Sequence, residues 1–101
     1  KVSLVAMGLA GETPTTEDRL CADYLKALLE NRPFDREGAA QYLRETDGAR
    51  FFRAESQGQA PEEDFWLSVD FDRFDFALPV RFDSRGRVYV EPVYPAKQQA
   101  R

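Results

Sequence analysis

Histidine is absent from the 101-residue sequence, and cysteine occurs once, as Cys21. Without histidine, the chain by itself cannot build a Ser-His-Asp or Cys-His catalytic arrangement or an imidazole metal site. A single cysteine excludes an internal disulfide and a cysteine-rich zinc site. We therefore expect any metal bound by this chain to be a hard cation held by oxygen ligands, such as magnesium or calcium.

Long apolar runs and an excess of positive charge are also missing. No stretch approaches the roughly 18 apolar residues of a membrane-spanning helix. The 14 Lys and Arg are outnumbered by 18 Asp and Glu, which gives a net charge of −4. Since a mildly acidic chain lacks the basic face that binds nucleic acids or anionic membranes, we expect neither as a partner. The single thiol and the lack of a signal-peptide pattern indicate a cytoplasmic protein.

Apolar residues, by contrast, are plentiful. The hydrophobic content of 43% is enough for one packed core in a chain of this length. We expect a single α/β domain over residues 1–94, followed by a polar tail over 95–101. Because the apolar run 2–7 begins directly after Lys1, without a polar arm, we interpret the chain as the C-terminal portion of a longer protein.

Helical periodicity is clearest in the first half of the sequence. Thr15 and Asp35 are suitable N-caps for two segments in which apolar residues recur at helical spacing. Pro61 is suited to the first turn of a later helix, which opens with acidic residues. The pattern predicts helices over 16–30, 36–45, 49–55 and 61–69.

Strand patterns lie at the two ends of the sequence. The apolar run 2–7 has the length of a strand, and in 74–82 apolar residues alternate with polar ones. A turn over 83–86 and a second strand over 88–92 complete a hairpin. The expected fold is α/β, with a small mixed sheet, a leading strand, three to four helices and a C-terminal β-hairpin, as half of a larger α/β/α protein.

The loop after the expected leading strand is the first candidate site. Gly8 and Gly11 let the backbone approach a phosphate closely, and the helix N-terminus at Thr16 favours negative charge. The pattern is neither a Walker motif nor a dinucleotide-binding fingerprint. The alternative is an ordinary connection between a strand and a capped helix, which the pattern by itself favours.

Glu12, Glu17 and Asp18 are the candidate metal ligands. Three carboxylates near one helix start can hold a magnesium ion, which takes a few carboxylates together with water and substrate phosphate. The alternative is that Glu17 and Asp18 only offset the helix dipole. Because carboxylates repel phosphate when no cation is present, we expect phosphate and magnesium to bind together or not at all.

Four segments resemble one enzyme family. Residues 5–8 (VAMG) and 16–22 (TEDRLCA) resemble the second half of the 2-phosphosulfolactate phosphatases. Residues 63–68 (EDFWLS) and 72–80 (DRFDFALPV) resemble the ending of the same family, in the same order. The resemblance implies a magnesium-dependent phosphatase that hydrolyses a small acidic 2-phospho-hydroxy acid, such as 2-phosphosulfolactate, on the route to coenzyme M.

The resemblance also assigns roles to residues. It implies that Glu17 and Asp18, with Glu12, ligate or orient magnesium, and that the backbone at 8–11 or Thr16 contacts the phosphate or carboxylate of the substrate. The nucleophile stays unassigned, and an N-terminal half of the same protein is implied as a partner in the site. A homodimer is compatible with such a compact enzyme.

A non-catalytic domain is the competing hypothesis. The chain contains 8 Phe, 4 Tyr and 1 Trp, which is enough to fill a core and leave apolar surface for a partner. The alternative function is therefore an interaction domain or a small-molecule-binding domain without turnover.

Overall fold

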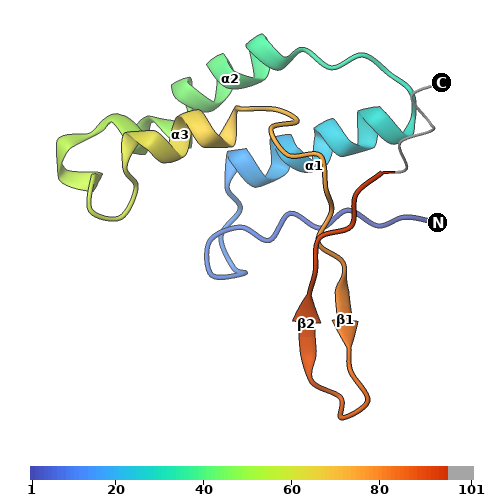
Figure 1. Ribbon diagram of the computed structural model, residues 1–101. Helices are drawn as coiled ribbons and strands as arrows, with labels where there is room; N and C mark the ends of the chain where they lie inside the picture. The colour runs from blue at the N-terminus through green and yellow to red at the C-terminus, as the bar shows by residue number, and fades with distance from the viewer. Residues whose placement is uncertain (96–101) are drawn as a thin grey trace. The chain divides into compact units, whose positions relative to one another are not determined.

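The computed structural model describes residues 1–95 (Figure 1). The chain divides into two compact units, Lys1–Phe71 and Asp72–Arg101. Sequence patterns predicted one domain over 1–94, and the predicted tail lies outside the described residues except for Pro95. The first unit contains the helices and the second contains the only sheet of the described chain. The α/β class, with several helices and a C-terminal hairpin, is confirmed.

The first unit contains three α-helices, and all three were predicted from the sequence (Figure 1). Helix α1 has Thr15 as its N-cap, and helix α2 is capped by Asp35, whose Oδ1 accepts a hydrogen bond from Gly38 N at 2.9 Å. In place of the short helix expected over 49–55, the chain forms two 3₁₀ helices, η1 and η2. The bounds of the α-helices and 3₁₀ helices are α1 Thr16–Leu29, α2 Arg36–Glu45, η1 Asp47–Phe52, η2 Ala54–Ser56 and α3 Glu62–Ser68.

The core of this unit is small and centred on η1. Phe51 and Phe65 are 4% and 1% exposed and their rings are 6.2 Å apart, while Leu43 of α2 is 1% exposed. The ring of Trp66 lies edge-on to that of Phe65 at 5.0 Å. Helix η1 contacts α1, α2 and α3. Because Phe51 of η1 is packed in this core, the backbone of η1 is held in place and the neighbouring Arg50 side chain leaves it in a fixed direction.

A second apolar cluster closes the other end of the same unit. The rings of Tyr24, Phe34 and Phe71 lie 4.9–5.8 Å from one another in edge or tilted arrangements. The Arg36 side chain donates to the Tyr24 hydroxyl at 2.9 Å. Such aromatic contacts hold the C-terminal half of α1 against the chain that follows it.

The expected leading strand over 2–7 is not present. The segment has no strand in the structure, and Val2, Val5 and Met7 are 66–74% exposed. A strand needs a partner for its backbone hydrogen bonds, and within residues 1–95 the only paired strands are those of the hairpin. The nearest pairing is the isolated bridge between Leu9 and Thr13. The sheet is therefore antiparallel rather than mixed.

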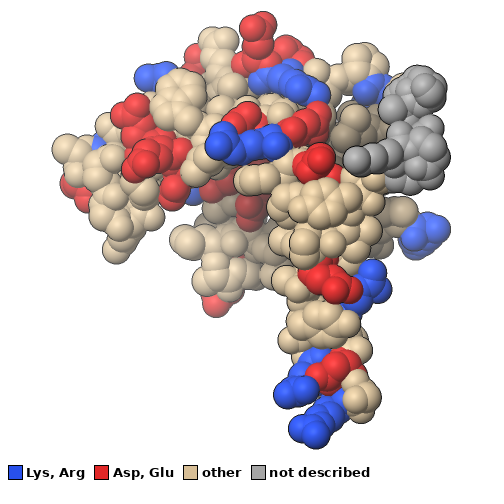
Figure 2. Space-filling model, viewed as in Figure 1, with Lys and Arg blue, Asp and Glu red and all other residues tan. Residues whose placement is uncertain are grey.

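The second unit is an antiparallel hairpin of β1 Val80–Phe82 and β2 Val88–Val90. Val80 pairs with Val90 and Phe82 with Val88, so these four side chains share one face of the ribbon. All four are 53–69% exposed. Charged side chains lie at the turn of the hairpin (Figure 2), and Arg81 of β1 forms a further ion pair with Glu91 at 3.3 Å. The hairpin was predicted, although β1 is shorter than the expected 74–82.

No helix within the described part of the chain is long and apolar enough to cross a membrane. The longest, α1, has 14 residues and carries Glu17, Asp18 and Lys26 among them.

Candidate functional site

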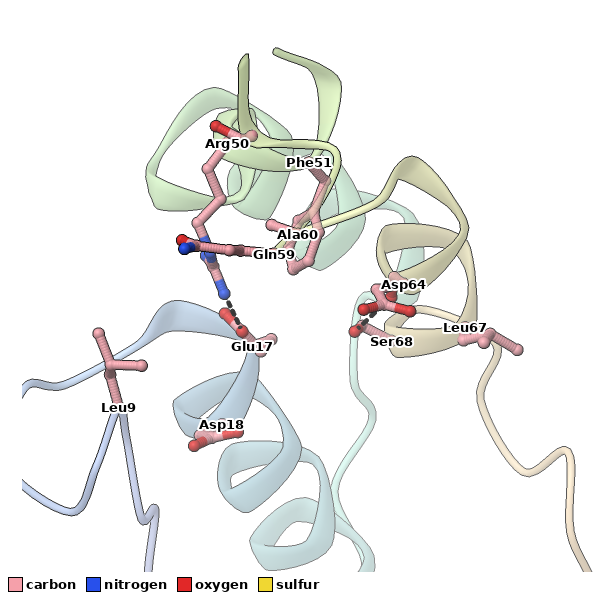
Figure 3. Close-up of a pocket in the computed structure, with 11 residues that line it drawn as sticks. Leu9, Glu17, Asp18, Arg50, Phe51, Gln59, Ala60, Asp64, Leu67 and Ser68 are labelled. Carbon is pink, nitrogen blue, oxygen red and sulfur yellow. Dashed lines mark hydrogen bonds and ion pairs between the residues drawn. The ribbon is translucent and has the colours of Figure 1, made fainter. Parts of the chain in front are cut away.

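A cleft of about 680 Å³ opens between the start of α1, η1 and α3 in the first unit (Figure 3). Its volume is within the range of small-molecule sites. Phe51, Ala60 and Leu67 give it apolar walls. Its charged lining consists of Glu17, Asp18, Arg50 and Asp64.

The cleft brings together two segments that are far apart in the sequence. Glu17 and Asp18 come from the first turn of α1, while Asp64 and Ser68 come from α3 on the opposite side (Figure 3). The hydroxyl of Ser68 donates to the backbone carbonyl of Asp64 at 2.7 Å. The core contacts of η1 set the spacing of these walls, so the site depends on tertiary packing rather than on one local motif.

Arg50 and Glu17 form the central ion pair of the cleft, at 2.5 Å between Nη2 and Oε2. Their side chains are 31% and 19% exposed. Arg50 also donates from Nη1 to the carbonyl of Asp47 at 3.0 Å and lies 4.3 Å from the centre of the Phe51 ring. Among the residues described, nothing bonds to the second oxygen of Glu17, Oε1, which is buried. The Arg50 guanidinium therefore has three contacts, with Glu17, the Asp47 carbonyl and the Phe51 ring. The Glu17 carboxylate is hydrogen-bonded through only one of its two oxygens.

The Asp18 side chain is hydrogen-bonded to the loop before α1. Its Oδ2 accepts the backbone N–H of Gly8 at 2.7 Å. Gly8 has φ +74°, and a Cβ there would lie 2.3 Å from the carbonyl oxygen of Thr13. Gly8 is thus required where the chain approaches itself, and its N–H, expected to contact phosphate, is donated to a carboxylate in this structure.

The remaining predicted site residues lie away from the cleft lining. Gly11 and Glu12 line a separate hollow beside Thr13, and the backbone N–H of Thr16 donates to Asp47 Oδ2 at 2.9 Å. Of the six residues predicted for metal or substrate binding, the structure therefore brings Glu17 and Asp18 into the cleft directly.

The residues present fit a magnesium ion only in part. Across residues 1–95 there is no group of three or more His, Cys, Asp or Glu placed to hold a metal, so the three-carboxylate site with Glu12 is not assembled. Magnesium often takes one or two protein carboxylates and completes its shell with water and substrate phosphate. Glu17 Oε2 is paired with Arg50 and Asp18 Oδ2 accepts from Gly8 N, and neighbouring positions on a helix do not face each other, so the two carboxylates do not form a preassembled site of this kind.

Sequence reasoning missed Arg50. It stands 33 residues from Glu17, and no periodic pattern or motif connects the two positions. The available signal was indirect, because Arg50 precedes the aromatic pair Phe51 and Phe52 in a segment expected to be a short helix. Asp64 and Ser68 lie in a segment that was singled out, but they were not assigned to a site.

Comparisons with protein-family models, with curated proteins and with solved structures gave no match. The possible chemistry of the cleft is therefore inferred only from the residues that line it. It can bind a small polar molecule against the guanidinium of Arg50, and it can offer the carboxylates of Glu17 and Asp18 to a cation.

Proposed function

We propose that this chain is part of a magnesium-dependent phosphatase that hydrolyses a small acidic 2-phospho-hydroxy acid, such as 2-phosphosulfolactate. One observation supports it above the others. The segments 16–22 and 63–68, which both resemble that enzyme family, contribute residues to the same cleft.

The charge of the cleft supports a cation requirement. Glu17, Asp18 and Asp64 carry three negative charges, and Arg50 carries one positive charge. An anionic phosphoester would be repelled from this lining unless a cation were bound with it. We therefore include Mg²⁺ as the cofactor, held by Glu17 and Asp18. When bound, such an ion neutralises phosphate charge and lowers the pKa of coordinated water.

The other groups of the cleft have simpler roles in this proposal. Phe51 and Leu67 exclude water from one side of a small substrate, and Ser68 and Gln59 offer polar contacts. The nucleophile is assigned to no residue of this chain. The N-terminal half implied by the family resemblance supplies further residues to the site.

We extend the proposal to the cellular compartment, which we infer to be the cytoplasm. Cys21 is an unpaired and exposed thiol, which suits the reducing conditions of the cytoplasm. A thiol in this state would be prone to oxidation outside the cell.

The test is magnesium-dependent phosphate release by the complete protein from a panel of 2-phospho-hydroxy acids. Asp18→Asn and Glu17→Gln should each lower the rate about 100-fold or more, with the fold retained. Glu55→Gln is the matched control, because Glu55 lies in η2 and outside the cleft lining. Lack of release from every substrate by the folded protein would rule out the phosphatase.

A second candidate, a non-catalytic interaction domain, is favoured by the hairpin. Val80, Phe82, Val88 and Val90 form an exposed apolar face. In the described chain each strand has one unpaired edge, and such edges pair with themselves across a two-fold axis. The occupant in this hypothesis is a second copy of the chain. Analytical ultracentrifugation tests it, since a dimer that Phe82→Ser dissociates supports it and a monomer at all concentrations contradicts it.

A further inference from the structure

The free edge of strand β1 has a regular pattern of backbone hydrogen-bonding groups. At one end of the hairpin ladder Ala77 and Val93 exchange both hydrogen bonds at 2.9 Å, and at the other end Asp83 N donates to Arg87 O at 3.0 Å. Both pairs keep the register of β1 with β2. In an antiparallel ladder, residues bonded to the partner strand alternate with residues whose N–H and C=O point away from it. The residues between Ala77 and Asp83 therefore face β2 and the free edge by turns.

Leu78, Val80 and Phe82 are the residues that face the free edge. None of them is a proline, so each places one donor and one acceptor there. Pro79, which has no N–H, faces β2, and its missing donor leaves the free edge complete. Within residues 1–95 no third strand pairs with β1. The edge is thus a template for another strand.

The opposite edge, on β2, is less complete. Its outward residues are Val88, Val90 and Pro92, and Pro92 has no N–H to donate. A charge is a common protection of an exposed edge, but the edge-facing positions of β1 carry none. The one charged residue of β1, Arg81, points to the other face and forms an ion pair with Glu91 at 3.3 Å. A further strand therefore fits β1 better than β2.

A second copy of β1 matches this edge across a two-fold axis. With Val80 opposite Val80 of the second copy, Leu78 lies opposite Phe82, and each outward N–H meets an outward C=O. These three side chains are 54–69% exposed and share a face with Val88 and Val90, so the apolar faces of the two hairpins join. An isolated two-stranded hairpin is marginally stable in water, whereas a sheet of more strands with an apolar face is stable.

We propose that β1 of one copy pairs antiparallel with β1 of a second copy, Val80 against Val80, and forms a four-stranded sheet. The inference rests on the second candidate function, in which a second copy binds the hairpin, and it is independent of the phosphatase. It adds the edge and the register of the pairing. Because the same residue of both copies lies at the axis, a charge placed at Val80 faces its own copy.

The experiment is analytical ultracentrifugation of the full chain and its variants over a series of concentrations. The native protein should form a dimer. Val80→Lys places two like charges opposite each other at the axis and should weaken the dimer about tenfold or more. Val80→Glu should weaken it in the same way. An equimolar mixture of the two variants should associate again, because opposite charges then meet at the axis.

Val90→Lys is the matched control. Val90 is the cross-strand partner of Val80 on the same face, and the two are 53% and 62% exposed. The control therefore places the same charge on the same apolar face, but on the strand that lies away from the axis. It should leave the affinity of the dimer within a factor of about three. Any loss of the hairpin caused by a lysine on this face would affect both variants.

The outcomes separate this inference from the candidate functions. A native protein that stays monomeric at every concentration would overturn the inference together with the second candidate. Equal weakening by Val80→Lys and Val90→Lys, without recovery in the mixture, would overturn the pairing through β1 and leave a hairpin dimer in place. A dimer that neither variant weakens belongs to another surface and contradicts both. Phosphate release by the native protein tests the phosphatase separately.

Discussion

Asp47 caps helix α1 from 31 residues away. Its Oδ2 accepts the backbone N–H of Thr16 at 2.9 Å, while the N-cap residue Thr15 makes no side-chain cap bond in this region. One of the open donors at the helix start is thus satisfied by a carboxylate of η1. The same contact fixes the first turn of α1, with Glu17 in it, against the segment that carries Arg50.

Removing this distant cap should loosen the site as well as the fold. Asp47→Ala should lower the free energy of unfolding by about 1–2 kcal/mol, since an N-terminal N–H of α1 loses its acceptor. Asp47→Asn keeps an acceptor oxygen and should recover part of the loss. Urea denaturation of the three proteins measures the difference. Equal midpoints for all of them would contradict the role of Asp47.

Gly8 should not tolerate a side chain. Gly8→Ala places a Cβ 2.3 Å from the Thr13 carbonyl in a backbone with φ +74°, and the strain should lower stability by about 1–3 kcal/mol. Gly58→Ala is the control, because a Cβ there has open space within 4 Å and should change stability by less than about 0.5 kcal/mol. Similar losses in both variants would contradict the close approach at Gly8.

Phe65 should contribute far more stability than its neighbour Leu67. Phe65 is 1% exposed in the core and Leu67 is 57% exposed. Phe65→Ala should cost about 3–5 kcal/mol through lost burial and the cavity left behind, a large share of the stability of a small domain. Leu67→Ala should cost less than about 1 kcal/mol. Thermal and chemical unfolding of both variants test the order.

The hairpin turn should loosen in acid. The hydrogen bond from the backbone N–H of Arg87 is the largest cause that holds the pKa of Asp83 below its ordinary value. Desolvation opposes it, and the Arg87 side chain and the backbone N–H of Arg85 lower the pKa further. Because the pKa is lowered in the folded state, this stabilisation is present above the ordinary pKa and is lost as pH falls through the folded-state value.

The measurement is the set of amide chemical shifts of β1 and β2 followed from about pH 7 to about pH 2. The shifts should stay constant to below the ordinary aspartate pKa and then move together. Asp83→Asn should remove this transition and leave any other acid transition in place. A transition that persists unchanged in the variant would exclude Asp83 as its cause.

Local patterns predicted the elements whose hydrogen bonds are local. Helices α1 and α2 and the turn around Asp83 were predictable because caps, periodicity and turn residues lie within a few positions of one another. The segment 2–7 has the composition of a strand, but composition does not supply a partner strand. The elements could therefore be predicted better than their pairing.

The site residues also divide into those that a local pattern predicts and those that depend on tertiary packing. Glu17 and Asp18 were found because acidic residues at a helix start form a local pattern. The Arg50–Glu17 pair was not found, because it depends on how η1 packs against α1 across 33 residues. Glu12 has the right chemistry and sequence proximity, but the turn at Gly11 carries it to another hollow.

The position of Trp66 decides what an optical experiment on this protein can see. It is the only tryptophan of the chain and lies on α3, beside Phe65 and within reach of Glu62 through its indole N–H. Tryptophan emission, excited selectively so that tyrosines do not contribute, therefore reports on the helical unit that contains Trp66, whereas the hairpin strand β2 carries Tyr89. A coincident transition by far-UV circular dichroism would show that both units unfold together, and a separate one would show that they do not.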